Sequence, residues 1–368
     1  MKLFLSLWSK WNIFGAYFFR WIGFPIEPDI IKVGTPDNTS PVLLTCNFSL
    51  TVKRVLKAVN HLDCYLLIAP SNGINVWCGA CGDDFNTDSV ISILKTSNIG
   101  ELVSHRDLIL PQLSAPGVDP IQIKNRSGWN VKFGPVYAKD IPNYISNNYG
   151  KSSSQREIKF PISKRLEMAN MYFFILFLMV TLFYWILAIF FSYLNFYLYL
   201  DSILLTAIVI YGSLLILPSI STKTGKLKVW VFELGVIIMI TFFYIYIHPN
   251  LFVFIWNICV SVLVSLIMSE DFHGLTPIYK SELGEKSWKK GKSEMKAIIG
   301  KFKLQPYGTI TLDREKCIGC KMCLEVCPRN LYQYNEKEKK VNLIFPEKCI
   351  NCNACVNQCL AKCLEITS

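Results

Sequence analysis

Nine of the 14 cysteines in this 368-residue chain lie between Cys317 and Cys363. Eight of them form two runs with one spacing, in which three cysteines separated by two residues are followed by a fourth after three residues. The runs are Cys317, Cys320, Cys323 and Cys327, then Cys349, Cys352, Cys355 and Cys359. Three closely spaced thiolates can hold one face of a [4Fe–4S] cubane. A zinc site would use paired knuckles and leave the fourth cysteine of each run unexplained.

With Pro328 after its last cysteine, the first run resembles the C-x₂-C-x₂-C-x₃-C-P motif of bacterial ferredoxins, in which the fourth cysteine reaches the other cluster. We therefore predict an α+β bacterial-type ferredoxin domain with two [4Fe–4S] clusters over residues 306–368. One cluster is assigned to Cys317, Cys320, Cys323 and Cys359, and the other to Cys349, Cys352, Cys355 and Cys327. Leu360 replaces the usual proline of the second run, and Cys363 remains as a spare thiol or a buried bystander.

A second pair of cysteines, Cys78 and Cys81, lies in the stretch Trp-Cys-Gly-Ala-Cys. Taken alone, this stretch is similar to a thioredoxin redox motif, in which a helix amino terminus lowers the pKa of the first thiol. The polar turn Pro70–Asn75 argues against that interpretation, because an apolar strand leads into the motif of a thioredoxin.

Residues 26–160 are predicted to form an α/β domain that positions these cysteines. The apolar runs Val42–Leu44, Tyr65–Ile68 and Leu108–Leu110 have the length of strands and are bounded by turn residues. Helix-like stretches, such as Thr51–Asn60 and Thr87–Thr96, lie between them. Alternating strands and helices indicate a mostly parallel sheet, which binds ligands at the carboxyl ends of its strands.

This domain resembles the mercury-methylation corrinoid proteins of the HgcA type, which are related to the corrinoid subunits of acetyl-CoA synthase complexes. Ile74–Cys78 is similar to the cap-helix motif of the family, and Ser40–Thr51, Leu108–Gly117 and Ser127–Asp140 continue the resemblance. The ferredoxin region resembles the family's separate electron donor, HgcB. The chain is thus similar to a fusion of the two over about residues 25–365.

The resemblance implies a cobalamin-type corrinoid whose cobalt is bound from below by the cap-helix cysteine, a role that falls on Cys78. The other implied corrinoid contacts are Thr45, Asn47, Thr51, Asn75, Val76, Trp77, Gly79, Ala80, Ala115, Pro116, Gly117, Gly134 and Pro135. The implied activity is that of a methyltransferase in which the fused ferredoxin, supplied by an upstream electron donor, reduces cobalt. The expected methyl donor is a methylated folate or pterin, or its methyltransferase.

The expected acceptor is a soft metal or a thiol-bound group, such as Hg(II), because soft thiolate ligands suit soft metals. Two departures leave the acceptor open. Cys81-Gly82 stands where the family has Gly-Lys, and the chain ends without the family's terminal cysteine pair. Cys81 is a second thiol for substrate, a redox partner or a packing residue. The alternative function is a corrinoid-free membrane redox protein in which the clusters reduce a Cys78/Cys81 dithiol.

Residues 166–270 are predicted to form a bundle of four transmembrane helices. Only 18% of the chain is charged, and four apolar stretches are long enough to cross a hydrocarbon core of roughly 30 Å. Lys164 and Arg165 precede the first stretch, and Lys223, Lys226 and Lys228 separate the second from the third. The positive-inside rule therefore predicts a multi-pass protein of the cell membrane with both soluble domains in the reducing cytoplasm.

Three further expectations concern the rest of the chain. Residues 1–25 are predicted to be an amphipathic helix, either in the membrane interface or docked on the protein, and residues 271–305 a Lys-rich cytoplasmic linker. Glu233, near the cytoplasmic end of the third helix, is either a functional acid inside the membrane or a side chain that reaches the interface, and the second interpretation is favoured. The net charge of +11 is ascribed to contact with the lipid bilayer, and no nucleic-acid partner is expected because aromatic and basic residues do not alternate.

Overall fold

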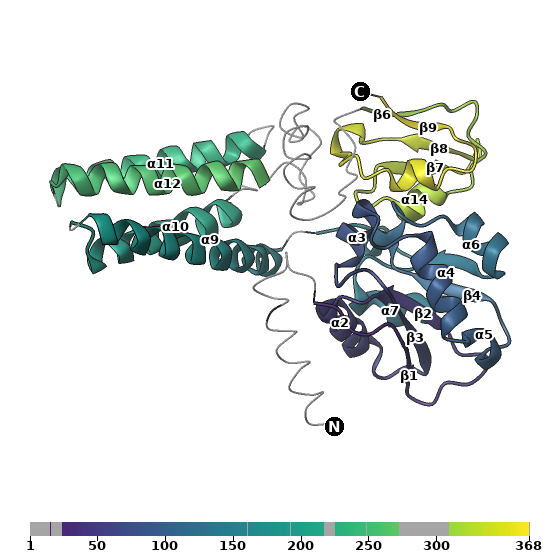
Figure 1. Cartoon of the computed structure of the whole chain (residues 1–368). Helices are drawn as coiled ribbons and strands as arrows, with labels where there is room; N and C mark the ends of the chain where they lie inside the picture. The colour runs from purple at the N-terminus through teal and green to yellow at the C-terminus, as the bar shows by residue number, and fades with distance from the viewer. Residues whose placement is uncertain are drawn as a thin grey trace, which may run out of the picture. The chain divides into compact units, whose positions relative to one another are not determined.

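A computed structural model describes residues 15, 24–159, 161–191, 193–216, 225–247, 249–271 and 309–367. The predicted amphipathic helix of residues 1–25 and the linker of residues 271–305 lie almost entirely outside these residues. The chain divides into two compact units. One unit contains the α/β domain together with the ferredoxin domain, and the other contains the apolar helices (Figure 1).

The α/β domain is built on a five-stranded sheet of order β1-β3-β2-β4-β5. The strands are β1 (Ile30–Val33), β2 (Val42–Cys46), β3 (Cys64–Ala69), β4 (Asp107–Leu110) and β5 (Asn130–Phe133). Strands β2 to β5 pair in parallel, and only the edge strand β1 runs antiparallel to its neighbour β3. The three predicted apolar runs lie within β2, β3 and β4, where they are buried on both faces. The prediction of a mostly parallel sheet is confirmed.

Helices cover both faces of this sheet, which is why the central strands are apolar throughout. They are α2 (Ser49–Val59), α3 (Val76–Gly82), α4 (Thr87–Thr96), α5 (Ile99–Leu102), η1 (Gln112–Ser114), α6 (Pro120–Ser127), η2 (Ala138–Asp140), α7 (Ile141–Ser146) and α8 (Ser153–Arg156). On one face Val55 and Val59 of α2 and Tyr144 of α7 pack on Leu43 and Leu66. Helices α4 and α6 pack on each other and on strands β3 and β5 (Figure 1).

The strand order reverses at β2, because the chain passes from β2 to β3 on one side and later from β3 to β4 on the other. In a doubly wound sheet, the carboxyl ends of the two strands at this switch point diverge and leave room for a ligand. The switch point here lies between β2, which ends at Cys46, and β4, which ends at Leu110.

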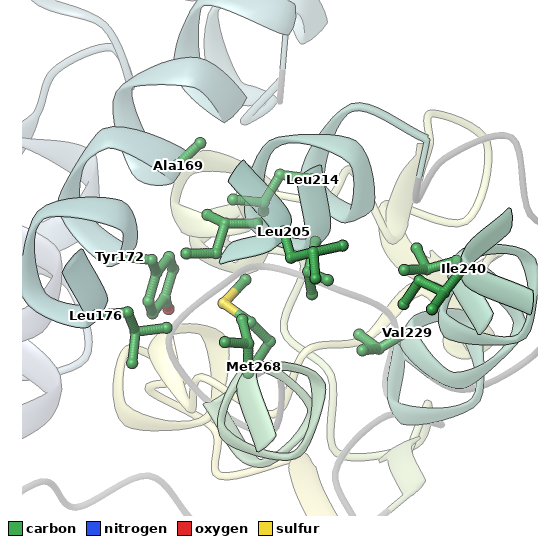
Figure 2. Packing of buried hydrophobic residues seen from close by; sticks show 12 residues of the cluster. Ala169, Tyr172, Leu176, Leu205, Leu214, Val229, Ile240 and Met268 are labelled. Atoms are coloured by element: carbon green, nitrogen blue, oxygen red, sulfur yellow. The ribbon is translucent and has the colours of Figure 1, made fainter. Parts of the chain in front are cut away.

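Among the described residues, four helices are long and apolar enough to cross a membrane, as predicted. They are α9 (Ile162–Phe190), α10 (Phe196–Ile216), α11 (Gly225–Tyr246) and α12 (Leu251–Asp271). Each contributes side chains to one apolar cluster, including Tyr172 of α9, Leu205 of α10, Ile240 of α11 and Met268 of α12 (Figure 2). The outward faces carry large exposed apolar side chains, such as Leu182 and Phe242, as lipid contact requires.

Glu233 does not reach outward from this bundle, so that expectation is wrong. Its side chain is fully buried, and the Ser265 hydroxyl of α12 donates a hydrogen bond of 2.6 Å to its Oε2. Polar groups inside a bundle are held by partners on facing helices, and this bond joins α11 to α12.

The ferredoxin domain contains two antiparallel strand pairs and two short helices. Its elements are β6 (Thr309–Leu312), α14 (Met322–Val326), β7 (Tyr332–Asn335), β8 (Lys340–Leu343), η5 (Pro346–Lys348), α15 (Ala354–Asn357) and β9 (Leu364–Thr367). Strand β6 pairs with β9, and β7 pairs with β8. The two cysteine runs occupy equivalent places in this repeat, since each contributes its third cysteine to a short helix, Cys323 to α14 and Cys355 to α15.

Candidate functional site

The residues implied to contact a corrinoid gather at the carboxyl ends of the four parallel strands. Thr45 lies near the end of β2, and α3 with its leading loop follows β3. The segment Ala115–Gly117 follows β4, and Gly134-Pro135 follows β5. Four segments that are distant in sequence therefore meet at the edge where this fold binds ligands. We call this set of segments the carboxyl edge.

Helix α3 presents Cys78 near its start. The Asn75 side chain caps the helix by accepting a hydrogen bond of 3.0 Å from the Cys78 amide, and Asp83 ends it in the left-handed conformation with φ of 76°. Trp77 and Cys78 are half-buried, whereas Val76, Gly79, Ala80 and Cys81 are buried. Cys78 and Trp77 are therefore the side chains that this short helix offers to a bound group.

Gly79 of α3 and Gly117 after β4 are both closely packed inside the domain. A Cβ on Gly79 would lie 3.0 Å from Cβ of Phe85. A Cβ on Gly117 would lie 2.6 Å from the carbonyl oxygens of both Ala80 and Phe85. Since these are backbone atoms, the segment after β4 can lie against α3 only with glycine at position 117.

Cys81 is 6% exposed, and burial raises the pKa of its thiol to about 12, with a smaller contribution from Cys78. The thiolate is the reactive form of cysteine, so a thiol with this pKa is almost entirely unreactive at neutral pH. Of the roles considered for Cys81, this environment favours packing.

Asn47 holds together the segments that carry the site. Its Oδ1 accepts hydrogen bonds from the amides of Ser71 and Gly73, both at 3.0 Å, and from the Ser71 hydroxyl at 2.8 Å. Its Nδ2 donates to the carbonyl oxygen of Ile26 at 3.0 Å. With these bonds the side chain positions the loop that leads into α3, which is a different task from the predicted corrinoid contact.

Thr45 and Thr51 lie on either side of the end of β2. Thr45 is 1% exposed, and its hydroxyl has no hydrogen-bond partner among the described residues. Thr51 is half-buried. Burial raises the pKa of the Cys46 thiol, and the side chains of Thr51 and Thr45 both act on it in the opposite direction, so the Thr45 hydroxyl lies near a thiol although it makes no hydrogen bond of ordinary geometry. A buried hydroxyl without a partner costs about 1–3 kcal/mol, so Thr45 suits a site that receives a polar ligand group.

The cysteines assigned to the first cluster line one cavity. This cavity has a volume of about 310 Å³, part of it open to solvent, and its wall includes Cys317, Cys320, Cys323, Cys359 and Cys363. Burial raises the pKa of Cys323 to about 12, and Cys320, Cys317 and Cys359 add to the effect. The thiols are therefore close enough to oppose each other's ionisation, as ligands of one anionic cluster must be.

The cysteines assigned to the second cluster are also mutual neighbours. Burial raises the pKa of the Cys355 thiol far above its ordinary value, and Cys327 and Cys349 raise it further. Burial likewise raises the pKa of Cys352, and Cys355, Cys327 and Cys349 add to the effect. Within the described part of the chain, no three His, Cys, Asp or Glu side chains converge as a single ion would need. A cubane has four separate irons, so its ligands stand further apart.

The ferredoxin domain contacts the α/β domain at the segment after β4. Gln358 is 5% exposed, and its Nε2 donates to the carbonyl oxygens of Ala115 at 2.9 Å and Val118 at 2.7 Å. The neighbouring Asn357 donates from Nδ2 to the carbonyl oxygen of Pro116 at 2.7 Å. Both residues immediately precede Cys359, so they join a predicted cluster ligand to a segment predicted to line the corrinoid.

A buried lysine forms the second part of this contact. Lys151, whose side chain is 0% exposed, lies 3.3 Å from Oε2 of Glu325 and donates to the Glu325 carbonyl oxygen at 2.8 Å. It also donates to the carbonyl oxygen of Gly134 at 3.1 Å. Burial lowers the pKa of Lys151 to about 8, although Glu325 acts in the opposite direction. Arg156 lies 3.5 Å from the second carboxylate oxygen.

Sequence reasoning missed Gln358, Asn357, Lys151 and Glu325. The position of Glu325 and Gln358 next to cluster ligands was the only signal available. Contacts between segments far apart in the chain leave no periodicity or motif in either segment.

Residues 24–145 match the family profile described as CO dehydrogenase/acetyl-CoA synthase delta subunit, and residues 309–360 match that of a 4Fe-4S dicluster domain. Three similar proteins are gamma subunits of acetyl-CoA decarbonylase/synthase complexes. Identity is 31% over 128 residues for Methanocaldococcus jannaschii. It is 30% over 122 residues for Methanopyrus kandleri and 34% over 123 residues for Methanothermobacter thermautotrophicus.

These alignments cover 33–34% of this chain and 26% of each relative, so the chain spans about a quarter of the length of the curated relatives it matches. Two independent matches therefore fall on the two regions whose motifs and geometry are described above. The chain thus combines a region similar to subunits of CO dehydrogenase/acetyl-CoA synthase complexes with a region that matches a 4Fe-4S dicluster domain. Within its described residues it also has four candidate membrane helices.

Proposed function

We propose that this chain is a membrane-anchored, corrinoid-dependent methyltransferase that carries its own iron–sulfur electron donor. The observation that carries the proposal is the contact made by Gln358. Its amide, one residue from Cys359, donates to two carbonyl oxygens of the segment after β4. A donor fixed to the cofactor domain in this way can deliver electrons without first finding its partner by diffusion.

Three residues at the carboxyl edge, Cys78, Thr45 and Asn75, are suited to hold a corrinoid. When bound, this cofactor supplies a cobalt that accepts and releases a methyl group, while the protein supplies binding, orientation and axial ligation. Cys78 is half-buried at the start of α3, where its thiolate is proposed to bind the metal. The unpaired Thr45 hydroxyl offers a hydrogen bond to a polar group of the ligand. The Asn75 cap fixes the backbone of Cys78 and so orients its thiol.

The ferredoxin domain is proposed to hold two [4Fe–4S] clusters with the cysteine sets given above. An upstream donor would reduce these clusters, and the clusters would then reduce the metal at the carboxyl edge. Tyr332 donates a hydrogen bond of 3.0 Å to Sγ of Cys355. Hydrogen bonds to cluster sulfurs raise the reduction potential, so this cluster is expected to accept electrons more readily than it would without the tyrosine.

The proposed substrates follow from the chemistry of the site. A methylated folate or pterin, or a protein that carries it, would give the methyl group. A soft acceptor would take it, and Hg(II) is the acceptor in the family that the sequence resembles. Because the matched relatives are subunits of acetyl-CoA decarbonylase/synthase complexes, the alternative acceptor is a group bound to a partner protein. Both soluble domains are proposed to face the cytoplasm, following the basic residues that flank the apolar helices.

Reconstitution with cobalamin tests the proposal. The full chain in detergent is loaded anaerobically, and its absorption spectrum is compared with those of Cys78→Ala and Cys81→Ala. We expect Cys78→Ala alone to change the spectrum, because Cys81 is buried and packs inside the domain. An unchanged spectrum for Cys78→Ala would remove the axial role. Incubation of the loaded protein with a methylated pterin and Hg(II) then shows whether methylmercury forms.

The dithiol alternative receives less support from the structure. Burial raises the pKa of the Cys81 thiol to about 12, which opposes thiol–disulfide exchange at this pair. Mass-spectrometric counting of thiols after oxidation, with and without reduced clusters, separates the two functions. A Cys78–Cys81 disulfide that opens on cluster reduction, in a protein that binds no cobalt, would favour the alternative.

A further inference from the structure

The cavity assigned to the first cluster has one thiol more than a cubane needs. Besides the four motif cysteines, its wall includes Cys363, which is 7% exposed. Sγ of Cys363 lies 3.4 Å from Sγ of Cys359, and the Cys363 amide donates to the same Cys359 sulfur at 3.3 Å. Cys363 also interacts with Cys317. The fifth thiol is therefore part of the cluster wall.

The distance between the two sulfurs indicates which iron they share. Sulfurs bound to one tetrahedral metal at about 2.3 Å stand about 3.8 Å apart, whereas ligands of different irons in a cubane stand much further apart. Cys359 and Cys363, at 3.4 Å, have the spacing of two ligands that can reach one metal centre. Since a cubane iron already holds three sulfides, it takes only one of them at a time.

We propose that Cys363 is an alternative ligand for the cluster iron that Cys359 binds, so that the two thiolates can exchange. This inference rests on the proposed assignment of the clusters. In the exchange, the iron–sulfur bond to Cys359 breaks and an iron–sulfur bond to Cys363 forms. The proton of the Cys363 thiol passes to the Cys359 thiolate across their contact. No electron is gained or lost, and no other reactant is needed.

The equivalent position in the first cysteine run carries no thiol, so this feature is confined to one cluster. Cys363 comes four residues after the last cysteine of the second run, and Leu331 comes four residues after the last cysteine of the first. Leu331 is 2% exposed and cannot bind iron. Cys327, the counterpart of Cys359, therefore has no spare thiol at this position and is a matched control.

The exchange would release a thiol at a useful place. Cys359 is half-buried, whereas Cys363 is buried, so exchange places the freed thiol on the more accessible side. The freed thiol also directly follows Gln358, which contacts the α/β domain. A soft metal or a thiol reagent would thus meet Cys359 while the cluster stays bound through Cys363.

Iron analysis of the full chain, purified anaerobically in detergent, tests the proposal. We measure iron and sulfide per chain and the electron paramagnetic resonance spectrum of the reduced protein. Cys359→Ala and Cys363→Ala should each keep the iron content and the cubane signals of the wild type. The double variant should lose iron from one cluster, and so should Cys327→Ala. Loss of iron in Cys359→Ala equal to that in Cys327→Ala would refute the exchange.

Alkylation of the wild type provides a test that does not depend on the folding of a variant. Native protein is treated with a maleimide, and the modified cysteine is identified by mass spectrometry. We expect modification of Cys359 with the clusters retained. Modification of Cys363 alone would overturn the proposal. A wild type that binds fewer than two clusters would instead overturn the cluster assignment, so the two failures are distinguishable.

Discussion

Replacing Gln358 with alanine should weaken the contact between the ferredoxin and α/β domains. The substitution removes two hydrogen bonds and leaves two buried carbonyl oxygens, those of Ala115 and Val118, without their donor. Each neutral hydrogen bond contributes about 0.5–1.5 kcal/mol net, and each stranded buried acceptor costs about 1–3 kcal/mol. For two bonds and two acceptors these ranges overlap at about 2–3 kcal/mol. A loss of that size corresponds to a factor of about 30–160 in the docking equilibrium.

Hydrogen exchange of the full chain measures this effect without requiring either cofactor domain to be active. The amides of Ala115 and Gly117 are bonded within their own segment, to the carbonyl oxygens of Gln112 and Ser114. The segment should therefore exchange faster once the ferredoxin domain releases it. In Gln358→Ala we expect peptides covering residues 112–119 to exchange faster by more than about tenfold, while peptides of the apolar helices stay unchanged.

Gln333→Ala is the matched control, because Gln333 belongs to the same domain but is exposed on β7. It should leave the exchange of residues 112–119 at the wild-type rate. Equal rates in Gln358→Ala and the wild type would show that the amide does not hold the domains together. The argument for a fixed electron donor would then lose its main support.

Three further predictions concern the α/β domain and its contact. Because burial lowers the pKa of Lys151 to about 8, the folded protein binds fewer protons than the unfolded protein between about pH 8 and 10.5. Lys151 should therefore become less unfavourable as pH rises through this window, by up to about 3 kcal/mol. Chemical denaturation at pH 7.5 and pH 10 gives the free energy of unfolding of the wild type and of Lys151→Met. The wild type should gain stability relative to the variant at the higher pH, and a difference that does not change with pH would contradict the prediction. Thr45→Val should raise the melting temperature of the cofactor-free protein by a few degrees, because it removes an unpaired buried hydroxyl, and should weaken cobalamin binding in a titration. If Thr45→Val changed neither the melting temperature nor the affinity for cobalamin, the hydroxyl would have no role. Gly117→Ala should cost several kcal/mol of stability, because its Cβ would meet two backbone oxygens at 2.6 Å, whereas Gly100→Ala, whose Cβ would meet Arg106 at 3.5 Å, should melt like the wild type.

Much of this architecture could be predicted from the sequence because its signals are local. The helix expected over Thr87–Thr96 has those bounds, and that expected over Thr51–Asn60 is observed as Ser49–Val59. The strand runs, the four apolar helices and the cysteine spacing are also properties of short segments. Each such segment carries its own apolar period or its own ligand pattern.

The rest depends on contacts that no short segment encodes. The antiparallel edge strand β1 pairs with a strand more than thirty residues away. Gly79 is predicted only as a corrinoid contact, and its packing against Phe85 depends on the turn after α3. The burial of Glu233 beside Ser265 depends on how α12 packs against α11, and the sequence of α11 alone does not reveal it. In each case the sequence specified the residue type, and the fold decided its partner.

The internal repeat of the ferredoxin domain raises a question of orientation that the contact residues answer. Glu325 and Asn357 come two residues before the last cysteine of their respective runs, so they are equivalent positions. A half-turn of the domain would exchange them. It would then place an amide beside the ammonium of Lys151 and a carboxylate against the carbonyl oxygen of Pro116. Lys151 would lose its counter-charge, and the carboxylate would repel the carbonyl oxygen. A single difference between two otherwise similar repeats therefore selects one orientation of the ferredoxin domain.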